Sequence, residues 1–351
     1  MKTKPMTKFA ILALSLVLVA CAGGGSEEAG CPAIDGREIN VVATTPMIGE
    51  FVSQVGGEKI NLTVLMPPEA NPHTYEPAPQ DAGTIAEADL VFYTGLLYEP
   101  AALVKLLENS ACSTDILSEV GESVFPIEFK EGGHDDHDDH DDHDDEEGHD
   151  DEEGHDDEEG HDDEEGHDDH EGHNHGAYDP HFWFDPSRVA YAAEYIESRL
   201  IEFDPENESS YKSSADSFVS ELNDLTKQVS ELISTVPSQN RKLITTHESL
   251  GYLEAKFGLE VLSTIIPSLN SANEISPSDL AGVIDVIEDN NVKVIFIESE
   301  APSVYSETIV AETGIKSVTG LYVETLKPGQ SYSEFLISNV KLITENLQDT
   351  D

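Results

Sequence analysis

Residues 131–176 constrain the fold more than any other part of the chain, because no packed core can be built from them. They repeat His-Asp-Asp from His134 to Asp145 and then Gly-His-Asp-Asp-Glu-Glu with a period of six. They hold 26 of the 72 acidic residues, with no Lys and no Arg. Such high charge with almost no apolar residues predicts disorder. The folded part must therefore be built from the segments on either side of this acidic tract.

The whole chain of 351 residues is acidic, with a formal net charge of −54 at pH 7. Outside the acidic tract, 46 acidic residues still face 18 basic ones. This charge excludes nucleic acid as a partner, because phosphate would be repelled, and it favours cations. A surface that keeps the protein soluble in a salty habitat is the alternative explanation for the charge outside the tract. It does not explain the regular His period.

Residues 1–20 predict an export signal. Three lysines precede an apolar stretch, Phe9–Val19, which is too short to span a bilayer. The Leu-Val-Ala-Cys that ends at Cys21 resembles a bacterial lipobox, which implies cleavage before Cys21 and lipidation of its thiol. A plain secretory signal with an incidental Cys is the alternative. We expect residues 21–32 to be the lipidated Cys and a flexible tether. The mature chain is then expected to be exported and anchored by its lipid to the outer face of the cytoplasmic membrane, or to be periplasmic.

Cys31 and Cys112 are the two cysteines that remain if Cys21 is lipidated. Outside the cytoplasm, an even number of cysteines is typical of disulfide pairing. The sequence does not show that the two residues are close in space, so a disulfide and two free thiols both stay open.

Strand-like and helical stretches alternate on both sides of the acidic tract. Before it, we expect strands at Ile39–Thr45, Asn61–Met66 and Leu90–Gly95, with helices at Pro46–Gly56, Gln80–Ala88 and Ala101–Asn109. After it, we expect strands at Lys242–Thr246, Val261–Ile265, Val292–Ile297 and Ile315–Thr319, with helices at Pro277–Asn290, Thr308–Glu312 and Ser331–Asn346. This alternation predicts parallel sheets with helices on both faces.

Two further helices are expected between these sets, at Pro186–Phe203 and Glu206–Thr235. The second has one amphipathic face, formed by Phe218, Leu222, Leu225, Val229 and Leu232. At about 45 Å, it is longer than one small lobe needs. We therefore expect an α/β fold of two Rossmann-like lobes, each a mainly parallel sheet flanked by helices, joined by one long backbone helix. The expected divisions are an N-terminal lobe at 33–185, a helical segment at 186–238 and a C-terminal lobe at 239–351.

Three of the 14 histidines lie outside the acidic tract, at positions typical of ligand sites. His73 follows an expected strand and His247 ends one, and open α/β sheets bind ligands beyond the carboxyl ends of their strands. His181 lies between two prolines, which restrict its backbone. Three imidazoles with one oxygen ligand make a normal tetrahedral zinc set. Each His alone is more often a structural residue, so the prediction rests on all three.

The sequences around these histidines resemble motifs of a known family. They read NPHTYEPAPQD at His73, DPHFWFDP at His181 and THESLGYL at His247. In this order they are similar to the metal motifs of the ZnuA/TroA-like solute-binding proteins of zinc- and manganese-uptake ABC transporters. The similarity extends from about Asn40 to Asn346. It implies two lobes with a rigid connecting helix, a binding protein and not an enzyme, and an ABC permease with its ATPase subunit as partners.

The resemblance implies that His73, His181 and His247 are metal ligands. The family's fourth ligand is usually an Asp in an Asp-Pro-Leu-like stretch, and Glu324 takes its place here, one methylene longer and without the proline. Water as the fourth ligand, with Glu324 a solvated loop carboxylate, is the alternative. Glu298 is a lesser candidate that we expect to be structural.

The same resemblance bears on the metal. In manganese-preferring members the third position is typically Glu, whereas here it is His247. Nitrogen-rich sites suit zinc and carboxylate-rich sites suit manganese. We therefore expect Zn²⁺ as the transported ion, with Mn²⁺ as the alternative.

The acidic tract lies where zinc-type members of the family often carry a His- and acid-rich loop. Its carboxylates raise the local cation concentration, and its imidazoles offer nitrogen that calcium and magnesium do not prefer. We hypothesise an accessory, low-affinity zinc collector and sensor; a solvated spacer that grew by repeat expansion is the alternative. The histidines concerned are His134, His137, His140, His143, His149, His155, His161, His167, His170, His173 and His175.

Capture of zinc outside the cytoplasm and its delivery to a permease is the leading functional hypothesis. A zinc hydrolase is a second class, because three histidines and an open position could activate water. No HExxH motif occurs, and Glu324 would close the site. A surface adhesin or metal-storage lipoprotein is the third.

Overall fold

The computed structural model describes residues 31, 34, 36–68, 70–129, 178–300 and 304–348. The expected signal peptide, Cys21 and the acidic tract lie outside the described residues, so lipidation of Cys21 and the collector role of the tract stay predictions. Within the described part, no helix is both long and apolar enough to cross a membrane.

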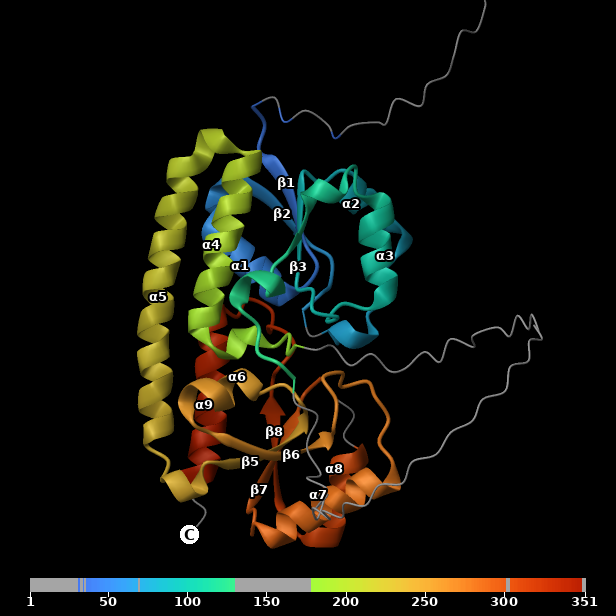
Figure 1. Cartoon of the computed structure of the whole chain (residues 1–351), viewed down its shortest axis with the longest axis vertical. Helices are drawn as coiled ribbons and strands as arrows, with labels where there is room; N and C mark the ends of the chain where they lie inside the picture. Colours follow the sequence, from blue (N-terminus) through green and yellow to red (C-terminus); the bar gives the residue numbers. More distant parts are fainter. Residues whose placement is uncertain are drawn as a thin grey trace, which may run out of the picture.

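The first lobe is built on a four-stranded parallel sheet in the order β2-β1-β3-β4 (Figure 1). Its strands are β1 (Ile39–Ala43), β2 (Ile60–Val64), β3 (Leu90–Tyr93) and β4 (Leu117–Glu119), of which the last was not expected. Its helices are α1 (Pro46–Gly56), α2 (Pro79–Ala86) and α3 (Ala101–Ser110). Thr45 starts α1 by accepting the N–H of Ile48, with Pro46 at the first position.

Two long helices lie against one side of the lobes. Helix α4 (Pro186–Phe203) leads into α5 (Glu208–Ser234), whose 27 residues are about 40 Å long. Figure 1 shows α5 running beside both lobes, and its buried face contacts α1 of the first lobe and α9 of the second. Leu232, expected on this face, is only partly buried, and Ile233 is buried in its place. The long connecting helix is confirmed.

The second lobe contains two parallel pairs of strands. β5 (Lys242–His247) pairs with β6 (Glu260–Ile266), and β7 (Val294–Glu298) pairs with β8 (Lys316–Leu321). Its helices are α6 (Gly251–Phe257), α7 (Pro277–Asp289), α8 (Val304–Thr313) and α9 (Tyr332–Gln348). The prediction of two α/β lobes with parallel sheets is confirmed, although the second sheet is described as two ladders rather than one.

Side chains join these two ladders where β5 and β7 lie side by side. The N–H of Glu298 donates to Oγ1 of Thr246 (3.0 Å), and the N–H of His247 donates to Oε1 of Glu298 (3.1 Å). Side-chain acceptors thus satisfy backbone groups that a continuous ladder would have paired. The same contacts hold the end of β5 that carries His247.

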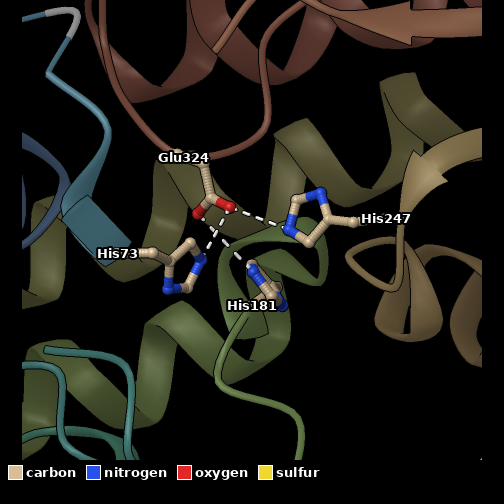
Figure 2. A group of neighbouring side chains, drawn as sticks. All are labelled: His73, His181, His247 and Glu324. Atoms are coloured by element: carbon tan, nitrogen blue, oxygen red, sulfur yellow. Dashed lines mark hydrogen bonds and ion pairs between the residues drawn. The ribbon is translucent and has the colours of Figure 1, made fainter. Parts of the chain in front are cut away.

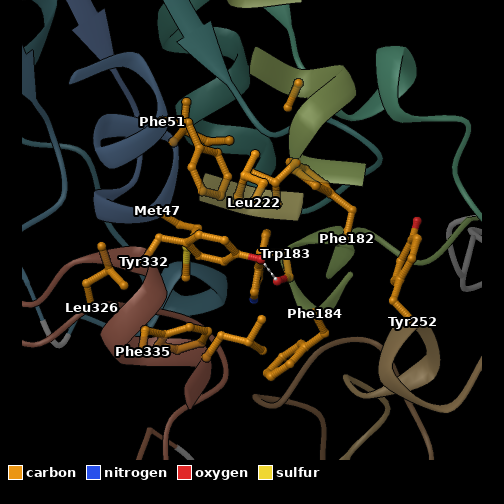
Figure 3. Close-up of a cluster of buried hydrophobic side chains, with 14 of the residues drawn as sticks. Met47, Phe51, Phe182, Trp183, Phe184, Leu222, Tyr252, Leu326, Tyr332 and Phe335 are labelled. Atoms are coloured by element: carbon orange, nitrogen blue, oxygen red, sulfur yellow. Dashed lines mark hydrogen bonds between the residues drawn. The ribbon is translucent and has the colours of Figure 1, made fainter. Parts of the chain in front are cut away.

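A buried aromatic cluster joins the lobes (Figure 3). The short turn Phe182–Phe184 lies between α1 and α9, and its three side chains are fully buried. Tyr332 of α9 donates to the carbonyl of Trp183 (2.6 Å) and packs edge-on against Phe51 of α1 (5.2 Å between ring centroids). The segment that carries His181 is therefore fixed against both lobes.

A disulfide joins Cys31 to Cys112, with 5.1 Å between their Cα atoms. Of the two alternatives left open by the sequence, the structure contains the disulfide. It fastens the start of the described chain beside the end of α3.

Candidate metal centre

The four side chains expected to bind metal come together between the lobes (Figure 2). His73 and His181 come from the first lobe, and His247 and Glu324 from the second. One ligand atom of each lies within 4.8 Å of the others. The side chains of His181, His247 and Glu324 are fully buried, and that of His73 is 3 % exposed. Glu324 is thus not a solvated loop carboxylate.

The carboxylate of Glu324 faces all three imidazoles. Its Oε1 lies 3.0 Å from Nε2 of His73 and 2.8 Å from Nε2 of His247. Its Oε2 lies 3.5 Å from Nε2 of His181. Zinc bonds of about 2.0–2.1 Å in a tetrahedron place ligand atoms about 3.3 Å apart. The distances to Glu324 bracket this value, so the four side chains are close enough together to share one zinc ion.

A short turn positions His73. The 3₁₀ turn Pro72–Thr74 begins with Asn71, whose side-chain oxygen accepts the N–H of His73 (2.9 Å). The Asn71 amide reaches into the other lobe, where it donates to Oγ of Ser271 (3.0 Å) and to the carbonyl of Glu300 (3.2 Å). His73 is thus placed by a residue that also bridges the lobes.

Buried carboxylates orient the other two imidazoles. Nδ1 of His181 bonds Oδ1 of Asp179 (2.8 Å), and Nδ1 of His247 bonds Oε2 of Glu298. A proton on Nδ1 leaves Nε2 as the ligand atom. Nε2 of His181 and of His247 is buried, and each lies against an oxygen of Glu324. Two such nitrogens aimed at one carboxylate fit a bound metal ion.

Several contacts hold the loop that carries Glu324. The carboxylate of Glu300 accepts the N–H groups of Val323 (3.2 Å) and Glu324 (3.3 Å). The indole N–H of Trp183 donates to the carbonyl of Val323 (2.8 Å), and the hydroxyl of Tyr98 donates to Oε2 of Glu324 (2.9 Å). The carboxylate therefore has a defined position before any metal enters.

The charges of the site are strongly coupled. Burial alone would lower the pKa of His181, but Glu324 and Asp179 raise it to about 9. Burial would also lower the pKa of His247, but the carboxylates of Glu298 and Glu324 raise it well above its usual value. Burial would raise the pKa of Glu324, but the three imidazoles hold it well below its usual range. Without metal the centre binds protons, and a metal ion must displace them.

Sequence reasoning missed some of the supporting residues. Asp179 had a usable signal, since it stands two residues before His181 in the same proline-bounded motif. Glu298, the lesser ligand candidate, lies on Nδ1 of His247 instead of among the ligand atoms, in line with the structural role expected of it. Tyr98 had no signal, because 226 residues separate it from Glu324.

Fold and site together define a class: a two-lobed metal-binding receptor with a buried centre of three histidines and one carboxylate between its lobes. Residues 41–346 match the family described as zinc-uptake complex component A, periplasmic. The chain belongs to this family, whose members are substrate-binding components of metal transporters and not enzymes.

Known proteins similar to this chain are named for more than one metal. It is 27 % identical to the high-affinity zinc uptake system protein ZnuA of Bacillus subtilis strain 168, over 97 % of this chain and 96 % of the relative. It is 25 % identical to the manganese ABC transporter substrate-binding lipoprotein PsaA of Streptococcus anginosus, over 98 % and 99 %. The periplasmic zinc binding protein TroA of Treponema pallidum has the same fold, with a TM-score of 0.70 at 20 % identity over 88 % of this chain and 99 % of that one. The choice of metal therefore has to be argued from the site.

Proposed function

We propose that this protein captures Zn²⁺ between its lobes, through His73, His181, His247 and Glu324, and delivers it to the permease of an ABC transporter. The observation that carries the proposal is the group of four ligand atoms, three of them imidazole nitrogens, within 4.8 Å of one another. A set of three nitrogens and one oxygen suits four-coordinate zinc better than manganese, which prefers oxygen ligands in octahedral geometry.

The arrangement of ligands across two lobes supports a transport role. Since two ligands come from each lobe, the bound ion holds the lobes together, and release requires the lobes to separate or shift. Docking on the permease would supply that change. An exported chain held by a lipid on Cys21 would stay close to the permease and its ATPase subunit. The names of the relatives, which include substrate-binding lipoproteins of ABC transporters, support this placement.

Metal content and competition test the proposal. The mature protein is purified, and its bound metal is measured with zinc and manganese competing, beside the double variant His73→Ala/His181→Ala. We expect one tightly held zinc in the wild type and none in the double variant, with weaker zinc remaining in both. Tight preference for manganese, or tight zinc that survives in the double variant, would overturn the proposal.

The collector hypothesis for the acidic tract has a separate test. Deletion of 131–176 is expected to remove the weaker zinc and to leave the tight zinc unchanged, because the four ligands lie outside the tract. Isothermal titration of both forms measures the stoichiometry. Equal total zinc in the two forms would contradict the collector and favour the solvated spacer.

A further inference from the structure

We propose that Tyr98 makes the centre selective for zinc over manganese, by leaving Glu324 one oxygen with which to bind metal. This inference rests on the proposed zinc function and names the residue that sets its specificity.

Glu324 is placed so that it can offer one oxygen or two. Both oxygens face imidazole nitrogens, Oε1 at 2.8 and 3.0 Å and Oε2 at 3.5 Å (Figure 2). With both oxygens bound, the centre would have five protein ligand atoms, which suits an ion of higher coordination number. With one oxygen bound, it would have the four of a tetrahedral zinc site. Whatever engages Oε2 therefore influences which metal is preferred.

Tyr98 engages Oε2. Its hydroxyl lies 2.9 Å from Oε2 and 3.2 Å from the carbonyl oxygen of Glu324, and the residue is only 1 % exposed. Its ring packs edge-on against His73, His181 and Trp183, with centroids 5.1, 5.9 and 5.3 Å away. The hydroxyl oxygen therefore has a fixed position beside Oε2. An oxygen that accepts a charge-assisted hydrogen bond gives up electron density that a metal would otherwise use.

The backbone before Tyr98 is strained, which points to a function for its placement. Gly95, Leu96 and Leu97 have φ angles of 75°, 53° and 62°, in the left-handed region that residues other than glycine rarely adopt. Strain of this kind persists where neighbouring groups enforce it. Glycine would adopt the φ angles of Leu96 and Leu97 with less strain, so the demands of a turn do not explain leucine at these two positions.

Two carboxylates brace this strained segment. Glu99 accepts the N–H groups of Thr94 (2.7 Å) and Gly95 (2.9 Å), and Glu119 accepts the N–H of Leu96 (2.9 Å). Three hydrogen bonds, two of them buried, thus hold the segment that places the Tyr98 hydroxyl beside Glu324.

The test compares Tyr98→Phe, which removes only the hydroxyl, with Tyr211→Phe. Tyr211 is equally buried and donates to a carboxylate, that of Asp204 (2.6 Å), but it lies on α5 and contacts none of the four ligands. Dissociation constants for zinc and manganese are measured by competition in the wild type and both variants. We expect Tyr98→Phe to reduce the ratio of zinc affinity to manganese affinity by about tenfold or more, mainly because manganese binds more tightly. A change of this size corresponds to the loss of one hydrogen bond to a charged group. Tyr211→Phe should leave the ratio unchanged.

Equal weakening of both metals in Tyr98→Phe, or an unchanged ratio, would overturn the inference and leave Tyr98 a structural residue. A crystal structure of the zinc-loaded wild type gives a second check that does not depend on folding of the variant. It should show zinc bonded to one oxygen of Glu324, and two bonded oxygens would overturn the inference. A wild type that prefers manganese would refute the zinc proposal, and a further shift toward manganese in Tyr98→Phe would then still show that the Tyr98 hydroxyl disfavours manganese.

Discussion

The histidines of the centre are held in two different ways. The rings of His181 and His247 are anchored by carboxylates on Nδ1, from Asp179 and Glu298. For His73, no hydrogen bond to Nδ1 is found among the described residues, and its backbone is fixed instead by Asn71. The anchored pair has one member in each lobe, whereas the placement of His73 depends on a residue that bonds across the lobes.

This difference implies different roles for the three histidines in metal binding. A ring held by a buried carboxylate keeps one orientation, so His181 and His247 direct Nε2 into the centre whether or not metal is bound. Asn71, which accepts the N–H of His73, also donates to Ser271 and to the carbonyl of Glu300 in the other lobe. We infer that the anchored pair accounts for most of the affinity, and that His73 reports whether the lobes are closed.

Removing an anchored ligand is expected to have the largest effect. His181→Ala or His247→Ala should weaken zinc binding by more than about a hundredfold, beyond what loss of an outer partner costs. His73→Ala should cost less, because the anchored pair and Glu324 keep their positions. Competition with a chromophoric zinc chelator measures all three. Lys212→Ala, on the exposed face of α5, is the control. Equal losses of zinc affinity in His73→Ala and His181→Ala would contradict this difference between the histidines.

The anchoring carboxylates come next in size. Asp179→Asn and Glu298→Gln should each weaken zinc binding by about 10–100-fold, because an amide can donate to Nδ1 and so place the ring proton on the ligand nitrogen. Asp204→Asn is the matched control, a buried Asp that bonds Tyr211 away from the centre. Nitrogen NMR of labelled histidines in the zinc-loaded protein reads the tautomers directly. Wild-type tautomers in Asp179→Asn would show that Asp179 does not act on the ring of His181.

Local sequence chemistry was enough to single out the three histidines, whereas Glu324 was proposed only from the family resemblance. His247 ends a strand, and His181 sits in a proline-bounded turn, so each is specified by its neighbours. The two lobes and the long helix were also predictable, since alternating strands and an amphipathic period are local patterns. Tyr98 was not, because only the packing of one lobe on the other brings it to Glu324. The split second sheet depends on the side-chain acceptors of Thr246 and Glu298, which no strand pattern shows.

A lower pH should stabilise the metal-free protein against unfolding and weaken zinc binding. The pKa of His181 is raised from 6.5 to about 9, so its bound proton stabilises the metal-free fold fully below pH 6.5. That stability is lost as the pH rises through 9. Zinc must displace this proton and any that His247 still holds, so its apparent affinity should rise at least about tenfold per pH unit between 7 and 9. Thermal melts with chelator and zinc titrations across this range check both trends. An affinity that does not change from pH 7 to 9 would contradict the protonated centre.

The smallest predicted effect concerns the bridge that places His73. Asn71→Ala removes the acceptor for the His73 N–H and both interlobe donors, so zinc should dissociate about three- to tenfold faster, the value of one or two hydrogen bonds. Ser271→Ala removes one interlobe partner and leaves the turn around His73 intact. Stopped-flow chelator exchange measures both rates, with Asn346→Ala on α9 as the control.

The two variants separate the two roles of Asn71. If closure of the lobes positions His73, Ser271→Ala should also speed dissociation, by less than Asn71→Ala does. If only the turn matters, Ser271→Ala should release zinc at the wild-type rate, and His73 would then be as independent of the second lobe as His181 is. The off-rate of Ser271→Ala therefore decides whether the contrast among the three histidines is one of function or of local geometry alone.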